Sequence, residues 1–146
     1  MCGIAGFYSS RRNYTGEEGR WRAVLEKMNR VQKRRGPDEE GKFLCAHCGL
    51  AHVRLSIIDL HRGRQPMTRT WRGKPCTVSF NGEIYNMPEL RRELEQEGAV
   101  FESDSDTEVI IQGYLLHGEG YVKKLNGIFA VALWDHNEDS LYLFRD

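Results

Sequence analysis

The sequence predicts an α+β fold in which antiparallel sheets build the core and helices pack against them. Short apolar runs bounded by turn residues recur along the chain and predict strands. Between them lie stretches with apolar residues at helical spacing. The chain has 146 residues, 40% of them hydrophobic and 10% aromatic, which suffices for one domain of ordinary size but not for two.

The first half of the chain is predicted to contain strands and one helix. Residues 3–8 form an apolar run of small side chains, typical of a buried strand with another backbone close by. From 17 to 34 the apolar residues repeat at helical spacing opposite a basic face, and Gly36-Pro37 ends this amphipathic helix. Further strands are expected before a loop at 63–66, and they span 43–45, 50–52 and 55–60.

The second half begins with a strand at 77–80 that the turn dipeptide Asn81-Gly82 is expected to close. Two helices follow, and each begins at a polar residue with a glutamate three positions later, which predicts a capping box. These helix starts are Asn86 and Ser105.

Gly98 and Gly118 are predicted to end these helices, because glycine readily adopts the backbone conformation of a helix terminus. Residues 127–134 are apolar enough for a strand buried on both faces. A polar turn then leads into a second strand at 141–144, so these two strands should form a hairpin.

Charge and apolar content argue against several classes of protein. Lys and Arg total 21 residues and Asp and Glu also total 21, so no net field draws the chain toward nucleic acid or an anionic membrane. No apolar run approaches the ~18 residues that span a bilayer, and the N-terminus lacks the profile of a signal peptide. We therefore expect a cytoplasmic protein whose cysteines stay reduced.

Cys2 can act as a nucleophile with its own general base if Met1 is removed, because this one residue then carries a thiol and a free amine. An α-amine has an ordinary pKa of about 8 and a thiol one of about 8.5, so the amine can accept the thiol proton near neutral pH. The amine thereby replaces the histidine of a Cys–His pair. Taken alone, a cysteine at position 2 is more often an incidental buried thiol than a nucleophile.

Other motifs give Cys2 its context, and they occur in this order: Cys-Gly-Ile-Ala-Gly at 2–6, Arg-Gly-Pro-Asp at 35–38, His-Val-Arg-Leu-Ser-Ile-Ile-Asp at 52–59, Gln-Pro-Met at 65–67, Asn-Gly-Glu-Ile-Tyr-Asn at 81–86, Ser-Asp-Thr-Glu at 105–108 and Leu-Asn-Gly-Ile-Phe-Ala at 125–130. Together they resemble the glutaminase domain of glutamine-hydrolysing asparagine synthetases. The resemblance covers residues 2–146 as one class II (type 2) glutamine amidotransferase domain. It implies the N-terminal-nucleophile hydrolase fold, an αββα sandwich of two antiparallel sheets flanked by helices, here C-terminally incomplete.

This resemblance implies hydrolysis of L-glutamine to glutamate and ammonia through a thioester on Cys2. In the longer proteins of the family, a synthetase domain in the same polypeptide uses the ammonia and ATP to make asparagine from aspartate. The Ser-Gly-Gly-x-Asp-Ser loop of that domain is absent from the sequence. We therefore expect a truncated chain or fragment that binds no cofactor, with ATP and Mg²⁺ needed only by the absent domain. The family also allows a homodimer.

The resemblance also assigns roles to single residues. The Asn81 side chain and the Gly82 N–H are implied to stabilise the oxyanion, while Arg54 grips the α-carboxylate and Asp106 the α-amine of glutamine. The other substrate-binding residues implied are Glu83, Leu55 and Ile57. A loop implied to close over bound glutamine consists of Arg35, Gly36, Pro37 and Asp38. Without the resemblance, Asn81-Gly82 would be an ordinary turn and Arg54 a solvated charge at a strand edge. Asp106 would be an acidic residue at a helix terminus, and residues 35–38 would be a helix stop.

Two readings from other classes stay open. The chain could be a non-catalytic remnant or interaction module of the same family, which missing strands or a retained Met1 would favour. Cys45-Ala46-His47-Cys48 has the spacing of half a zinc site, and Cys76 is the nearest further thiol. The second alternative is therefore a metal-binding regulatory domain built on Cys45, Cys48 and Cys76. A structural zinc site needs four ligands and the resemblance implies no metal, so we expect none.

Overall fold

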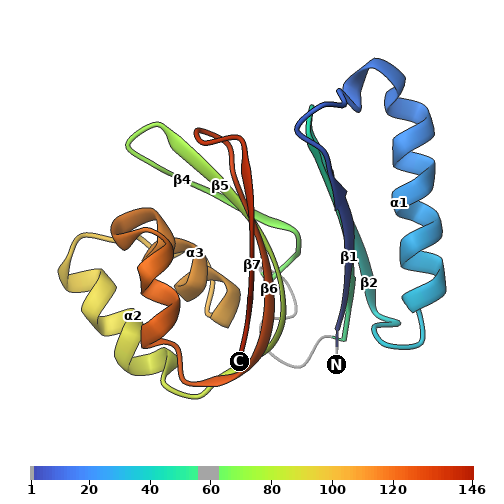
Figure 1. The fold of residues 1–146 in the computed structure, drawn as a ribbon. Helices are drawn as coiled ribbons and strands as arrows, with labels where there is room; N and C mark the ends of the chain where they lie inside the picture. The colour runs from blue at the N-terminus through green and yellow to red at the C-terminus, as the bar shows by residue number, and fades with distance from the viewer. Residues whose placement is uncertain (1, 56–62) are drawn as a thin grey trace.

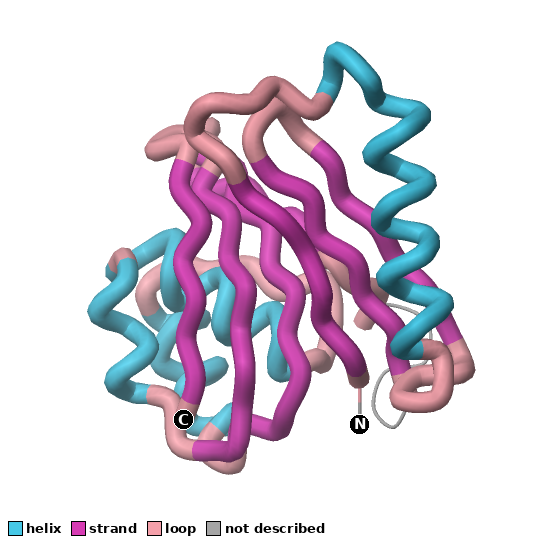
Figure 2. Tube along the Cα trace, turned by 45° about the vertical axis from the view of Figure 1, so that its right-hand side comes forward, coloured by secondary structure: helices cyan, strands magenta, loops and turns pink. Residues whose placement is uncertain are grey.

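The computed structural model describes residues 2–55 and 63–146 and contains two antiparallel sheets (Figure 1). The first sheet has the strand order β1-β3-β2, with β1 at Gly3–Tyr8, β2 at Glu39–Leu44 and β3 at Cys48–Arg54. The second has the order β4-β5-β6-β7, with β4 at Met67–Trp71, β5 at Lys74–Ile84, β6 at Gly127–Asp135 and β7 at Ser140–Arg145. The strand axes of the two sheets are roughly aligned with one another (Figure 2).

Helices cover the outer faces of both sheets. Helix α1 (Glu18–Gln32), after the 3-10 turn η1 (Thr15–Glu17), lies on the first sheet. Helices α2 (Met87–Gln96) and α3 (Asp106–His117), with the 3-10 helix η2 (Glu119–Lys124), lie on the second (Figure 1). The predicted α+β arrangement of two antiparallel sheets with flanking helices is confirmed. No helix in the described ranges is both long and apolar enough to cross a membrane.

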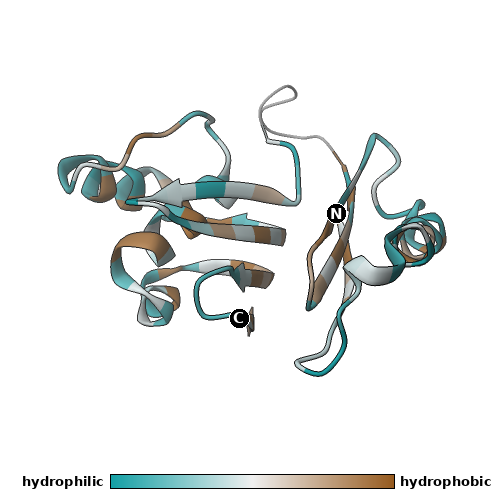
Figure 3. Ribbon diagram, turned by 90° about the horizontal axis from the view of Figure 1, so that it is seen from above, coloured by the Kyte–Doolittle hydropathy of each residue, from teal (hydrophilic) through white to brown (hydrophobic). Residues whose placement is uncertain are grey.

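The larger core lies between the second sheet and its helices. Val78 and Phe80 of β5 and Leu133 of β6 pack there against Leu94 of α2 and Ile111 of α3. Because side chains alternate along a strand, the residues between these positions face the other sheet. Viewed from above, apolar segments of the two sheets face each other across the middle of the molecule (Figure 3).

A smaller apolar cluster closes the space between the sheets. Cys48 and Leu50 of β3 pack against Ala132 and Trp134 of β6, and all four are buried. We call these four residues the inter-sheet cluster. It lies toward the start of β3, so the sheets are joined by apolar contacts at the end of β3 that is remote from Arg54.

Some local predictions are wrong. Asn81-Gly82 is no turn, because β5 continues to Ile84 and pairs with β6 in an unbroken register, Gly82 lying opposite Phe129. Strand β6 is not buried on both faces, since Ile128 is 59% exposed. Strand β4 and helix η2 were not expected from the sequence. Most of the strand predicted at 55–60, including Ile57, lies outside the described residues.

The two capping boxes are also wrong, although the helices begin where predicted. Neither Asn86 nor Ser105 makes a side-chain cap hydrogen bond. Asn86 instead joins two distant segments, since its Nδ2 donates to the Lys124 carbonyl and its Oδ1 accepts from the Asn126 N–H, both at 2.9 Å. Long-range contacts therefore use the side chains that local capping would have used.

Candidate active site

A cavity of about 290 Å³ lies where the ends of β3 and β5 meet the start of α3. That volume is near the lower end of the ~300–1,000 Å³ range of small-molecule sites and suits a ligand of amino-acid size. Its lining comes from distant parts of the sequence: Cys2, Arg54, Leu55, Gly63, Gln65, Phe80, Asn81, Gly82, Glu83, Tyr85, Ser105, Asp106, Thr107 and Ile128.

Most of the predicted catalytic and substrate-binding residues meet at this cavity. Those that line it are Cys2, Arg54, Leu55, Asn81, Gly82, Glu83 and Asp106. Ile57 lies outside the described residues. The structure thus supports their proximity, while the role of each residue stays a prediction.

Cys2 is held at the cavity by the strand that follows it. Strand β1 pairs with the central strand β3, and Gly3 lies opposite Val53. The Cys2 thiol is partly exposed, and its Sγ lies 4.0 Å from the Leu55 carbonyl oxygen. Arg35 Nε donates to the Cys2 carbonyl at 3.1 Å. A chain end usually frays, but here pairing in the sheet fixes the thiol in place.

Arg54 ends β3 and is only 5% exposed. Its Nη1 donates to Glu39 Oε2 at 3.2 Å, and Glu39 lies directly opposite it in β2. Arg64 Nε contacts the other oxygen of Glu39 at 2.8 Å. One carboxylate therefore bridges two guanidinium groups, which orients the Arg54 side chain at the cavity wall.

The segment predicted to gate the site, residues 35–38, lies against the backbone of Arg54. Asp38 N–H donates to the Arg54 carbonyl at 3.1 Å. A Cβ on Gly36 would come within 2.5 Å of the Arg54 nitrogen, so only glycine allows this approach. The residues that line the cavity in the described part of the chain do not include this segment. Its closure over a substrate stays a prediction.

Asp106, the first residue of α3, is 8% exposed. Its Oδ2 accepts a 2.7 Å hydrogen bond from the Ile84 N–H at the end of β5. Burial raises the pKa of this carboxyl; the Ile84 N–H opposes the shift and the nearby Glu83 carboxylate adds to it. The Asp106 and Glu83 carboxylates repel each other, so a cationic ligand between them would be favoured.

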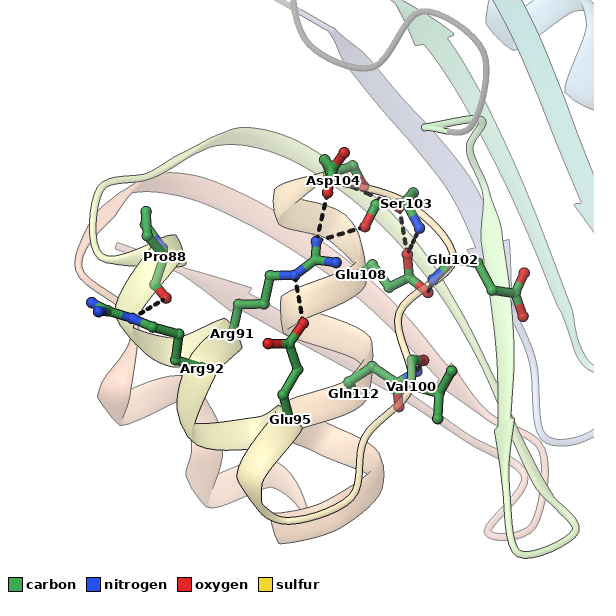
Figure 4. A network of polar contacts seen from close by, with 11 residues as sticks. Pro88, Arg91, Arg92, Glu95, Val100, Glu102, Ser103, Asp104, Glu108 and Gln112 are labelled. Atoms are coloured by element: carbon green, nitrogen blue, oxygen red, sulfur yellow. Dashed lines mark hydrogen bonds and ion pairs between the residues drawn. The ribbon is translucent and has the colours of Figure 1, made fainter.

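A network of polar contacts fixes the loop before Asp106 (Figure 4). The fully buried Glu108 accepts hydrogen bonds from Arg69 Nε at 2.7 Å, Glu102 N–H at 3.0 Å and Ser103 N–H at 2.6 Å. Burial alone would raise the pKa of Glu108, but these donors outweigh it and hold the pKa below its ordinary value. Arg91 adds a hydrogen bond to the Ser103 carbonyl at 2.8 Å. These hydrogen bonds therefore hold the loop that leads into Asp106 and α3.

Asn81 and Gly82 lie side by side in β5 at the cavity. Gly82 has φ +152°, and a Cβ there would lie 2.1 Å from the Ile128 carbonyl oxygen, so glycine is required at this position. Asn81 Oδ1 is buried and has no hydrogen-bond partner among the described residues. A buried amide oxygen without a partner costs free energy, and a ligand that donates a hydrogen bond to Oδ1 would offset that cost.

Sequence reasoning gave no role to several lining residues, and Gln65 shows why. It belongs to a motif in a loop, and its Oε1 accepts a 2.6 Å hydrogen bond from the Phe80 N–H in β5. The Gln-Pro-Met motif was the only signal, and it did not reveal this contact. Tyr85 and Ile128 also line the cavity and are 55% and 59% exposed; the motifs at 81–86 and 125–130 contain them, but no role was assigned to either.

The other thiols form no metal site in the described ranges, where no group of three or more His, Cys, Asp or Glu side chains is placed to hold an ion. Cys45, Cys48 and Cys76 are free. Burial raises the pKa of Cys48 to about 12, so this thiol stays protonated at neutral pH.

Comparison with protein families gives a match over the whole chain, because the model of the glutamine amidotransferase domain matches residues 1–146. Glutamine-hydrolyzing asparagine synthetases 3 and 1 of Bacillus subtilis are 38% and 39% identical to it over 146 residues. The homologous enzyme of Sandersonia aurantiaca is 40% identical over the same length. The alignments cover all of this chain but only 23%, 22% and 26% of those proteins, so the chain spans about a quarter of their length.

Solved structures share the fold. The glutamine phosphoribosylpyrophosphate amidotransferase of Bacillus subtilis, complexed with ADP and GMP, superposes with a TM-score of 0.54 at 23% identity, covering 63% of this chain and 22% of that one. A structure described as the allosteric regulatory enzyme of purine biosynthesis gives 0.53 with the same identity and coverage. The two sheets with their flanking helices therefore form the fold of amidotransferases with an N-terminal nucleophile.

Proposed function

This chain belongs to the family of glutamine amidotransferase domains, and from that premise we propose that it hydrolyses L-glutamine through a thioester on Cys2. One observation carries the proposal: a single cavity brings Cys2 together with a buried arginine, a pair of acidic side chains and an Asn-Gly pair. A thiol nucleophile, two clamps for a zwitterion and donors for an oxyanion are the groups that this reaction needs.

Substrate binding follows from charge. The Arg54 guanidinium suits the α-carboxylate of glutamine, because two parallel N–H groups match two carboxylate oxygens. Asp106 and Glu83 suit the α-ammonium group, which would relieve the repulsion between these carboxylates. The side-chain amide then extends toward Cys2.

The reaction needs a free amine on Cys2, so the proposal includes removal of Met1. The amine takes the thiol proton, and the sulfur attacks the side-chain carbonyl carbon of glutamine. Asn81 and the Gly82 N–H stabilise the oxyanion; one such donor contributes roughly 3 to 4 kcal/mol. Collapse of this intermediate breaks the C–N bond, and the ammonium of Cys2 returns its proton to the leaving amide nitrogen as ammonia. Water then cleaves the thioester to give glutamate and restore the thiol.

In a longer protein of this family, we propose that the ammonia reacts with an ATP-activated carboxylate, that of aspartate. The names of the relatives support this acceptor. ATP and Mg²⁺ belong to that second step, and the groups around the Cys2 cavity do not require them.

Turnover tests the proposal. The 146-residue chain, with Met1 removal checked by intact mass, should release glutamate and ammonia in equal amounts from L-glutamine. Cys2→Ala should abolish this release. Cys45→Ala is the matched control, because it removes another partly exposed thiol and should leave turnover unchanged. A folded, Met1-free chain that releases no glutamate would overturn the proposal and favour a non-catalytic interaction module.

A further inference from the structure

A hydrogen bond joins the two sheets immediately behind the cavity. His52 of β3 places Nδ1 2.9 Å from Ser79 Oγ of β5, and both residues are fully buried. They are 27 residues apart in the sequence. The bond thus ties the central strand of one sheet to an inner strand of the other.

Each partner lies two positions before a cavity residue on the same strand. His52 precedes Arg54, and Ser79 precedes Asn81. Since side chains two apart in a strand point to the same face, the cross-sheet bond and the two cavity residues share the inner faces of the sandwich. A change in sheet spacing at His52 and Ser79 would therefore change the separation of Arg54 and Asn81.

The bond also marks where apolar packing ends. Leu50, two positions before His52, belongs to the inter-sheet cluster, as does Ala132, which lies opposite Ser79 in the β5–β6 register. Beyond the bond, the space between the sheets opens into the cavity. Burial and the nearby Arg54 charge lower the pKa of His52 to about 4, so the imidazole is neutral when it contacts Ser79 at neutral pH.

We propose that the His52–Ser79 hydrogen bond is a positioning contact that sets the distance between Arg54 and the Asn81-Gly82 pair, and with it the length of amino-acid amide that the site accepts. The inference rests on the proposed function, in which Arg54 on one sheet holds the α-carboxylate and Asn81-Gly82 on the other holds the amide oxygen. The substrate then spans the two sheets. Asparagine is shorter than glutamine by one methylene, a difference worth roughly 10- to 200-fold in a well-fitted pocket.

The test is Ser79→Ala, with kcat and KM measured for L-glutamine and L-asparagine. We expect kcat/KM for glutamine to fall about tenfold and the preference for glutamine over asparagine to shrink by a similar factor. Alkylation of Cys2 by iodoacetamide should keep its wild-type rate, because that reagent needs neither clamp. Ser79→Thr, which retains a hydroxyl, should restore most of the preference.

Thr77→Val is the matched control. Thr77 lies on the same face of β5 as Ser79. Its hydroxyl contacts Thr68 Oγ1 and His136 Nε2, each at 2.8 Å, and neither partner belongs to the first sheet. Loss of this hydroxyl should lower stability without changing the glutamine-to-asparagine ratio. Equal ratios in Ser79→Ala and Thr77→Val would overturn the inference.

A milder variant covers the case in which Ser79→Ala does not fold. Ser79→Cys keeps the shape of the side chain and weakens the bond, so the preference should fall by a smaller factor; an unchanged preference would count against the inference. Wild-type chain without any glutamine turnover contradicts the proposed function instead, and the two failures are thereby distinguished.

Discussion

The two ends of the space between the sheets differ in what fills them. At one end, Leu50 and Trp134 bring the sheets together through buried apolar surface. At the other, Arg54 and Asn81 face a cavity, where Asn81 Oδ1 and Ser105 Oγ are buried and have no hydrogen-bond partner among the described residues. The contrast shows that the residues that stabilise the sandwich and the residues of the candidate site lie at opposite ends of the same strands. Because apolar packing at one end holds the two sheets together, the other end can contain a cavity.

The largest effect expected is on stability, from Trp134→Ala at the apolar end. Trp134 is 2% exposed, and deleting a buried Trp side chain costs about 3–5 kcal/mol of unfolding free energy because a cavity remains. Urea unfolding measures this loss. Leu143→Ala is the control, since Leu143 is 72% exposed and its truncation should cost far less. The kcat of the folded fraction of Trp134→Ala should change little; a collapse of kcat would break the separation of the two ends.

At the open end, Asn81→Ala should lower kcat and leave the free energy of unfolding nearly unchanged. Removal of one oxyanion donor raises the barrier by roughly 3 to 4 kcal/mol, or about 10²–10³-fold in kcat. Stability should hold, because Asn81 Oδ1 has no partner to lose among the described residues. Asn86→Ala is the control: it breaks two hydrogen bonds outside the cavity and should lower stability while leaving kcat intact. Wild-type kcat in Asn81→Ala would remove this residue from the site.

Acid should lower the free energy of unfolding through His52, which lies between the apolar end and the cavity. The folded state lowers its pKa from 6.5 to about 4, so between these pH values the unfolded chain binds more protons than the folded one. This contribution to stability is complete above pH 6.5 and is lost as the pH falls toward 4. A shift of this size corresponds to about 3 kcal/mol. Urea unfolding of wild type and His52→Gln across this range should show a flatter pH dependence in the variant. Parallel curves would contradict a buried, neutral His52.

Periodic patterns in the sequence predicted helices well, whereas local signals such as turn dipeptides and capping boxes were poor predictors. Helix α1 was expected at 17–34 and spans Glu18–Gln32, because an amphipathic stripe reports directly on burial. The Asn81-Gly82 turn failed, because continuous pairing of β5 with β6 outweighs the preference of two residues. The capping box at Ser105 failed for a similar reason, since the Glu108 carboxylate is taken by Arg69 and Ser103.

The candidate site was likewise predictable from the sequence only in part. Motifs shared with a family singled out Cys2, Arg54 and Asp106, but no periodicity in the sequence joins residues that far apart. Their proximity arises from strand pairing and from the packing of α3 on the second sheet. The His52–Ser79 bond was beyond sequence reasoning altogether, because neither residue type predicts a partner in another sheet.

The most direct measurement of the central claim is peptide mapping by mass spectrometry after treatment with a diazoketone analogue of glutamine, an electrophile that only a nucleophile in a glutamine-shaped site should capture. The account predicts one label, on the Cys2 peptide of Met1-free chain, which excess L-glutamine suppresses and Cys2→Ala abolishes. A folded, Met1-free chain that takes up no label, or takes it up at Cys45 as readily as at Cys2, would contradict it.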